Sequence, residues 1–188
     1  MEINEALPEY KRYTYDDYCE WADDKRWELI DGVPYAMSAP SLAHQEISGN
    51  LFNQLYNFLK GKQCKVFAAP VDVRLNVDFG DDTVVQPDIL VVCDKSKLDD
   101  GKSVLGAPDL VIEISSPSTS LRDRVLKLNR YLQAGVREYW IVDPEDQSVS
   151  VHLLKNNEYV INACGGDESI PVHVLEGCVI ELPDVFAK

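Results

Sequence analysis

The sequence has few basic residues and no long apolar run. Only 18 of its 188 residues are Lys or Arg, against 32 Asp or Glu, so the formal net charge is −14. This charge disfavours non-specific adhesion to nucleic acid, because phosphate binding draws on Lys and Arg. No apolar stretch approaches the length that spans a membrane, so we expect no membrane association. We also expect no signal peptide, since the first residues lack a basic region followed by an apolar one.

Cysteine is also scarce. The chain has five cysteines, and no two of them have C-x-x-C spacing. The odd count and the spacing indicate neither a disulfide framework nor a zinc knuckle. Free thiols are typical of a reducing compartment, so we expect a cytoplasmic protein with unpaired cysteines.

The composition is that of an ordinary globular protein. Hydrophobic residues make up 45% of the chain and charged residues 27%, with no internal repeat or low-complexity segment. A chain of this length can bury one sizeable core but is short for two. We therefore predict a single domain over residues 1–188.

The first half of the chain predicts two helices and a hairpin. Thr14 can cap a short helix, with Asp17 completing a capping box. Asp31-Gly32 predicts a tight turn between two strands. Ser41 can cap a long helix that ends near residue 61. The predicted buried stripe of that helix comprises Leu42, Ile47, Leu51, Leu55, Phe58 and Leu59.

The second half predicts a sheet crossed by one helix. We expect a pair of strands within 64–77, strands at 83–93, 109–116, 139–143 and 148–154, a polar loop at 94–108, and two or three short strands between 160 and 182. Val85, Ile89 and Val91 should share a face of one strand, and Pro87 marks a bulge, an edge or a strand start. A helix at 121–134, capped from 118–120, would bury Leu121, Val125, Leu128 and Leu132. The strand–helix–strand unit predicts a parallel crossover and an α/β fold with a mixed sheet flanked by helices.

Two acids stand out because they lie in apolar strands. Asp88 belongs to QPDILVV and Glu113 to LVIEISS, and Lys127 follows on the next helix. A charge in such surroundings is costly unless it is paired or binds a metal. Carboxylate oxygens suit Mg²⁺, and a nearby ammonium could stabilise a growing negative charge. The pattern therefore indicates a metal-assisted hydrolytic site.

A second interpretation of the same residues stays open. Asp123 and Lys127 have the spacing of a surface ion pair on a helix. Asp88 could be only a strand-end acid after a proline. Glu28, just before the Asp31-Gly32 turn, would then be an exposed strand acid, and His44 a residue of a helix's first turn.

Longer stretches of the chain resemble a known family. ELIDG at 28–32, HQEISGNL, VQPDILVV, GAPDLVIEISSPSTS and DRVLKLNRYLQAGVREYWIVDP are similar to the Uma-two family of restriction-type endonucleases, within the PD-(D/E)xK nuclease superfamily. The resemblance extends from about Tyr13 to about Leu154. It implies a restriction-endonuclease-like αβββαβ core with a β-rich C-terminal extension, and magnesium-dependent hydrolysis of DNA phosphodiester bonds.

The resemblance also implies a set of site residues. Asp88 and Glu113 match the two metal-binding acids. Ser115 stands where the parent signature has its lysine, and Lys127 matches a lysine moved to the following helix. The expected catalytic set is Asp88, Glu113, Lys127, Glu28 and His44, with Asp88, Glu113 and Glu28 as ligands of Mg²⁺, for which Mn²⁺ could substitute.

The expected partner is DNA, bound weakly and with a dependence on salt. Two groups of basic residues could form a patch: Arg122, Arg124, Lys127 and Arg130 on one helix, and Lys60, Lys62 and Lys65 after the other. Cutting both strands of a duplex would favour a homodimer. The alternatives are a non-catalytic interaction or regulatory protein on a nuclease-like fold, and a metal hydrolase of small phosphate esters.

Overall fold

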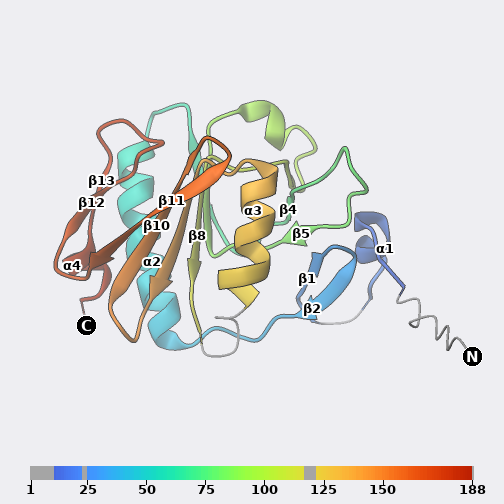
Figure 1. The fold of residues 1–188 in the computed structure, drawn as a ribbon, viewed down its shortest axis with the longest axis horizontal. Helices are drawn as coiled ribbons and strands as arrows, with labels where there is room; N and C mark the ends of the chain where they lie inside the picture. Colours follow the sequence, from blue (N-terminus) through green and yellow to red (C-terminus); the bar gives the residue numbers. More distant parts are fainter. Residues whose placement is uncertain (1–10, 23–24, 117–121, 188) are drawn as a thin grey trace, which may run out of the picture.

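The computed structural model describes residues 11–22, 25–116 and 122–187 (Figure 1). The helices are α1 (Tyr15–Cys19), α2 (Leu42–Leu59), α3 (Leu128–Ala134) and α4 (Leu182–Val185), with a 3₁₀ turn η1 (Lys95–Leu98) and a π-helical turn η2 (Arg122–Lys127) that leads directly into α3. The strands are β1 (Trp27–Ile30), β2 (Val33–Ala36), β3 (Lys65–Ala68), β4 (Val73–Arg74), β5 (Val84–Val85), β6 (Ile89–Val92), β7 (Val104–Leu105), β8 (Leu110–Ile114), β9 (Glu138–Asp143), β10 (Ser148–Lys155), β11 (Glu158–Gly165), β12 (Ser169–Pro171) and β13 (Val179–Glu181).

A six-stranded sheet forms the centre of the molecule, in the order β11-β10-β9-β8-β6-β3. Strands β8 and β9 are parallel and are joined through η2 and α3, while the other neighbours are antiparallel. In chain order α2, β3, β6, β8, α3 and β9 give the αβββαβ arrangement. The predicted mixed sheet flanked by helices, with strands added at the C-terminal end, is therefore confirmed.

The alternation of side chains along β6 explains why a helix covers each face of this sheet. Ile89 and Val91 lie in one hydrophobic cluster with Leu51 and Leu55 of α2. Leu90 lies in a second cluster, on the side of α3. Successive side chains of a strand point to opposite faces, so α2 and α3 pack on opposite sides (Figure 1). All five residues of β8 are buried, as predicted for a central strand.

A second, five-stranded sheet has the order β2-β1-β5-β4-β7. Its hairpin turns at Asp31 (φ 53°) and Gly32 (φ 72°), as the Asp-Gly pair predicts. A Cβ at Gly32 would lie 2.7 Å from Cβ of Arg12, so the turn also depends on the close approach that glycine allows. Ile30 of β1 belongs to the cluster that contains Tyr131 of α3. This packing brings β1 next to the central sheet.

Two long strand predictions divide between the sheets. The predicted strand 83–93 is interrupted at residues 86–88, so Val85 faces a different cluster from Ile89. Pro87 cannot donate a ladder hydrogen bond, which explains the interruption. Likewise β3 and β4, predicted as neighbours within 64–77, belong to different sheets. The predicted polar loop 94–108 contains η1 and β7.

The helix caps are predicted better than the buried stripes. Ser41 caps α2, and Gly135 (φ 85°) ends α3. Leu42, however, is 90% exposed, because it lies in the first turn and the buried stripe begins only at Ile47. Val125 is 47% exposed, since the π-helical turn shifts the angular spacing of the side chains that precede α3. Pro117, which follows the predicted strand 109–116, lies outside the described residues, and so do the predicted cap at 118–120 and Leu121.

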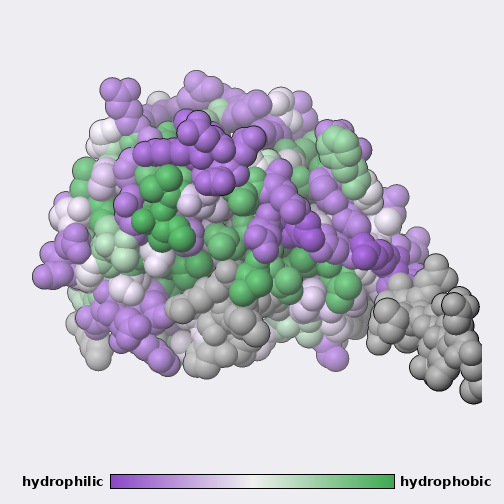
Figure 2. All heavy atoms as spheres, in the orientation of Figure 1, coloured by the Kyte–Doolittle hydropathy of each residue, from purple (hydrophilic) through white to green (hydrophobic). Residues whose placement is uncertain are grey.

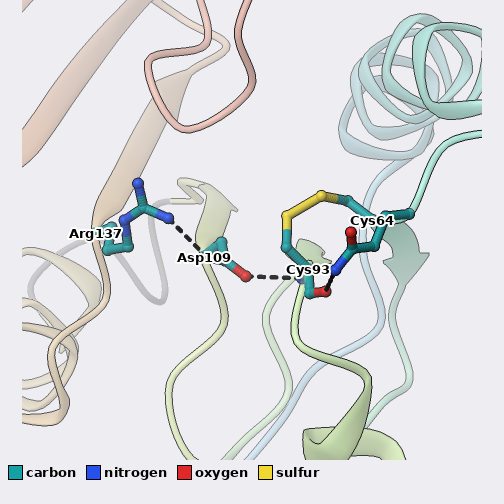
Figure 3. The surroundings of a disulfide bond; sticks show 5 residues. Cys64, Cys93, Asp109 and Arg137 are labelled. Carbon is teal, nitrogen blue, oxygen red and sulfur yellow. Dashed lines mark hydrogen bonds and ion pairs between the residues drawn. A yellow bond between two sulfur atoms is a disulfide. The ribbon is translucent and has the colours of Figure 1, made fainter.

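The cysteine prediction is wrong for one pair. Cys64 and Cys93 form a disulfide, shown in Figure 3. They extend the antiparallel ladder in which Lys65 pairs with Val92, so register places the two cysteines opposite each other. Free thiols remain at Cys19, Cys164 and Cys178.

The C-terminal elements cover α2 and close the core on that side. Asn50 donates to the carbonyl of Val185 at 3.2 Å, and Gln54 donates to that of Glu181 at 3.1 Å.

Thr14 caps α1 in the predicted capping box with Asp17. In the part of the chain that the structure describes, no helix is both long and apolar enough to cross a membrane. The face in Figure 2 is largely hydrophilic, with apolar areas between.

Candidate active site

Glu28 of β1 is completely buried rather than an exposed strand acid. Its Oε1 accepts a hydrogen bond from the main-chain N–H of Gln86 at 2.9 Å. The same oxygen lies 2.7 Å from Nζ of Lys127. The carboxylate is therefore held between the start of α3 and the segment that joins β5 to β6.

Glu113 and Lys127 form a second buried ion pair, with 2.9 Å between Oε1 and Nζ. Glu113 is 4% exposed and Lys127 is 1% exposed. The phenol of Tyr131 also donates to Oε1 of Glu113, at 2.7 Å. One ammonium thus bridges acids from two different sheets. Lys127 and Tyr131 are four residues apart and lie on the same face of the helix.

Asp88 and His44 form a neighbouring pair. Nε2 of His44 lies 3.1 Å from Oδ2 of Asp88, and the main-chain N–H of Ile114 donates to the same oxygen at 2.8 Å. Ile114 directly follows Glu113, so the carboxylate of Asp88 is anchored one residue from that of Glu113. The side chain of Asp88 is 19% exposed and that of His44 is 12% exposed. The Asp88 side of the site is therefore the side that solvent reaches.

The electrostatics of the buried group depend on Tyr131. Burial raises the pKa of Tyr131 well above its usual value, and the nearby carboxylate of Glu113 raises it further. The phenol stays protonated, so it can donate to Glu113 at neutral pH. Because a buried carboxylate needs a charged or hydrogen-bonding partner, Lys127 and Tyr131 together stabilise the ionised form of Glu113.

A polar network fixes the segment that contacts Glu28. The side-chain oxygen of Gln86 accepts from Arg26 at 3.0 and 2.7 Å. Its amide donates to Asp72 at 2.8 Å and to the Tyr18 hydroxyl at 3.1 Å. These contacts come from α1, the start of β1 and the approach to β4. Gln86 is 7% exposed. Its side-chain hydrogen bonds hold the residue in place, so that its main-chain N–H points at Glu28.

The structure brings the five predicted site residues into two adjoining groups. Glu28, Glu113 and Lys127 form the buried one, and Asp88 with His44 the outer one. The ammonium of Lys127 is buried against Glu28 and Glu113 rather than exposed on the surface of the helix. The side chain of its proposed partner Asp123 lies outside the described part of the chain.

Ser115 has a structural contact. Its hydroxyl donates to the carbonyl of Val142 at 3.1 Å, which ties β8 to β9. A lysine there is not needed to reach Glu113, because Lys127 does so from the helix. Asp109, which follows Pro108, accepts from the N–H of Cys93 at 2.8 Å and lies 3.1 Å from Arg137 (Figure 3).

Two of the four residues of the predicted basic patch on the crossover helix are engaged within the protein. Lys127 is buried, and Arg130 makes an ion pair with Asp31. The side chains of Arg122 and Arg124 lie outside the described part. The second group, Lys60, Lys62 and Lys65, is exposed.

Tyr131 and Gln86 were missed in the sequence. Tyr131 had a usable signal, because a residue four positions after a buried lysine shares its helix face. Gln86 had none, since its contact to Glu28 is made by the main chain and its side-chain partners are 14 to 68 residues away.

The comparisons with known proteins agree with this architecture. A crystal structure from Anabaena variabilis, described as that of a putative nuclease belonging to DUF820, superposes with a TM-score of 0.75 at 20% identity, covering 93% of this chain and 98% of that one. The fold is therefore a restriction-endonuclease-like α/β fold. Residues 14–183 match the model of the Uma2 family, described as "Putative restriction endonuclease", and the chain belongs to this family.

One curated relative has no described activity. It is the uncharacterized protein slr1290 of Synechocystis, 29% identical over 154 residues, or 79% of this chain and 77% of that protein. Membership of the Uma2 family therefore supports a nuclease.

Proposed function

We propose that this protein is a metal-dependent endonuclease that hydrolyses DNA phosphodiester bonds. The observation that carries the proposal is the position of Lys127, whose ammonium lies within hydrogen-bonding distance of both Glu28 and Glu113. The parent signature places a lysine on the strand, at position 115 here. Lys127 reaches the same acid from a different element, which supports the proposal that the chemistry at Glu113 requires a lysine beside it.

The donor set fits a hard divalent cation. Asp88 and Glu113 supply carboxylate oxygens from neighbouring strands, which are the ligands that Mg²⁺ prefers. Among the residues that the structure describes, no three side chains of His, Cys, Asp or Glu are grouped so that they could hold a metal on their own. The remaining ligands would then be main-chain, water or phosphate oxygens, as is usual for Mg²⁺. Glu28 as a third ligand stays a prediction.

When bound there, Mg²⁺ would supply a Lewis acid and lower the pKa of water. Mn²⁺, which also takes oxygen ligands, should substitute. The protein residues would do the rest. Lys127 would donate from Nζ to an oxygen that gains negative charge, and Glu28 would keep that ammonium in position. Tyr131 would orient Glu113 through Oε1, and His44 would orient Asp88 through Oδ2.

The direct test is cleavage of supercoiled plasmid DNA by the purified protein with Mg²⁺ or Mn²⁺. We expect nicking or cutting by the wild type and none by Asp88→Asn or Glu113→Gln. Tyr159→Phe, a change at a partly buried residue away from the site, should remain active. If wild type and Asp88→Asn are equally inert across supercoiled, linear and single-stranded DNA, the proposal fails.

One observation favours a second candidate. Glu28, Glu113 and Lys127 are at most 4% exposed, which also suits a purely structural ion-pair network in a non-catalytic protein. Calorimetric titration with Mg²⁺ or Mn²⁺ separates the two. An active site should bind metal in the wild type and lose it in Glu113→Gln, whereas a structural network should bind none in either. A chromogenic phosphodiester assayed beside DNA tests the other alternative, because a hydrolase of small phosphate esters should cleave the chromogenic substrate and leave DNA intact.

DNA binding should be weak. The net charge of −14 opposes it, and the burial of Lys127 and the pairing of Arg130 leave few cations on α3 for phosphates. We propose that the affinity falls as salt rises, with a slope set by the small number of phosphate contacts. We also propose a homodimer, because two sites are needed to cut both strands; light scattering of the purified protein would test it.

A further inference from the structure

A cavity of about 630 Å³ lies between α3, the β1–β2 turn and the loop that joins β4 to β5. Figure 1 shows α3 in the middle of the molecule with β4 and β5 beside it. None of the five predicted site residues lines this cavity. Its volume is in the range of about 300–1,000 Å³ that is typical of small-molecule sites.

The floor of the cavity is apolar. Leu75, Ala107 and Ala134 line it, and Leu75 is 8% exposed. One wall is polar: Arg130 makes an ion pair with Asp31 and donates to the side-chain oxygen of Gln133. The charges of Arg130 and Asp31 offset each other, and Asp78 also lines the cavity, so the lining carries no excess positive charge. This wall therefore offers hydrogen-bonding groups without the excess positive charge that a phosphate site requires.

An aromatic side chain stands at the rim. Phe79 lines the cavity and is 85% exposed. Its loop is held in place, since the N–H of Phe79 donates to the carbonyl of Asn76 at 2.9 Å and the amide of Asn76 donates to Asp82 at 2.7 Å. An exposed aromatic ring on a hydrogen-bonded loop, beside apolar lining residues, offers a face on which a planar ring can stack.

We propose that this cavity binds the base of an unpaired nucleotide. The base would stack on Phe79, and the amide N–H₂ group of Gln133 would donate to its edge. Apolar and aromatic lining residues, together with polar groups that carry no excess positive charge, match a neutral planar ring with hydrogen-bonding groups. This inference rests on the proposed function and narrows its substrate class to DNA that is single-stranded or locally unpaired.

The position of the cavity relative to the acids supports the inference. Arg130 follows Lys127 by three residues on one helix, a rise of about 4.5 Å. Asp31 follows Glu28 by three residues along β1 and its turn, at most about 10 Å. Along either element, the cavity therefore lies within about 10 Å of the residues that form the proposed site.

The test is binding of fluorescently labelled hexathymidylate in EDTA, measured by anisotropy so that no cleavage is needed. The comparison ligands are the same backbone with abasic sites, a duplex of equal length, and free thymidine as competitor. The variants are Phe79→Ala and Gln133→Ala. Tyr56→Ala is the matched control, because Tyr56 is a 52% exposed aromatic on α2 that does not line the cavity.

We expect the wild type to bind hexathymidylate more tightly than either the abasic strand or the duplex. Phe79→Ala should weaken this binding about fivefold or more, since stacking on one base contributes on that order. Tyr56→Ala should bind like the wild type. If free thymidine competes, the base alone is recognised. If free thymidine does not compete but binding still depends on Phe79, the base is recognised only within a strand. Both results support the cavity.

Equal affinity of wild type and Phe79→Ala, or equal affinity for the abasic strand, would overturn the inference. The result is distinguishable from failure of the proposed function. A protein that cuts DNA but binds independently of Phe79 refutes only the cavity. A protein that binds through Phe79 but cuts no DNA refutes only the nuclease.

Discussion

Nζ of Lys127 lies 2.9 Å from Oε1 of Glu113, although the two residues come from a helix and a strand and are separated by 13 others. The contact is buried, and Glu28 approaches the same ammonium from another sheet. The fold thus gathers three charges around one point.

Lys127→Met should be both destabilising and inactive. It leaves Glu28 and Glu113 buried without their cation, which costs about 3–5 kcal/mol in the free energy of unfolding. Adding Glu28→Gln removes one of the two buried charges and should recover part of that loss. DNA cleavage should stay absent in the double variant. Urea unfolding and plasmid nicking measure the two effects; a double variant that cuts DNA would refute a catalytic Lys127.

Asp88→Asn should abolish metal binding at little loss of stability. The amide keeps an oxygen that can accept from the N–H of Ile114, so the free energy of unfolding should change by about 1 kcal/mol or less. Calorimetry should detect Mg²⁺ or Mn²⁺ binding in the wild type but not in the variant. Asp109→Asn is the matched control, another aspartate before a strand, and should bind metal normally.

Tyr131→Phe tests the orientation of Glu113. Removing the hydroxyl deletes a buried hydrogen bond to a carboxylate and should cost about 1.5–3 kcal/mol of stability. It should also lower kcat for DNA cleavage. Tyr159→Phe removes a partly buried hydroxyl that donates to the carbonyl of Val136 at 2.9 Å and should lose stability without losing activity. Equal kcat in both variants would mean that Tyr131 is only structural.

His152 should make stability depend on pH. It is 5% exposed, and burial lowers its pKa. A histidine whose folded-state pKa lies below its unfolded value of about 6.5 leaves stability intact above that pH and reduces it as pH falls towards the folded value. His152→Leu should flatten this part of the profile below about pH 6.5. Unfolding in urea at several pH values measures it, and parallel profiles for wild type and variant would contradict the assignment.

The disulfide should contribute measurably to stability. Closing the 29-residue separation of Cys64 and Cys93 should contribute about 3–4 kcal/mol if the chain-entropy account holds. Dithiothreitol should therefore lower the midpoint of urea unfolding of the wild type. A Cys64→Ser/Cys93→Ser variant should match the reduced wild type and ignore the reductant. A wild type insensitive to dithiothreitol would refute the bond's role.

The order of elements was readable from the sequence because local signals were strong. The caps Thr14 and Ser41, the Asp31-Gly32 turn and the continuously apolar strand 110–114 each determine structure within a few residues. The long helix and the strand–helix–strand crossover follow from the same short-range patterns, and so does the central αβββαβ arrangement.

What the sequence could not supply depends on contacts between distant residues. The split of 83–93 between two sheets and the pairing of Cys64 with Cys93 require the registers of strands. The burial of Glu28 depends on Gln86 and Lys127, and the exposure of Val125 follows from a π-helical turn. The family resemblance, not the spacing, indicated that Glu28 and His44 belong with the acids.

The most direct measurement is the position of Mn²⁺ in a crystal of the wild type soaked in manganese, located by its anomalous scattering. We predict one ion coordinated at about 2.1–2.2 Å by carboxylate oxygens of both Asp88 and Glu113, with Lys127 still beside Glu113. Manganese bound elsewhere, with neither Asp88 nor Glu113 as a ligand, would contradict the proposed active site.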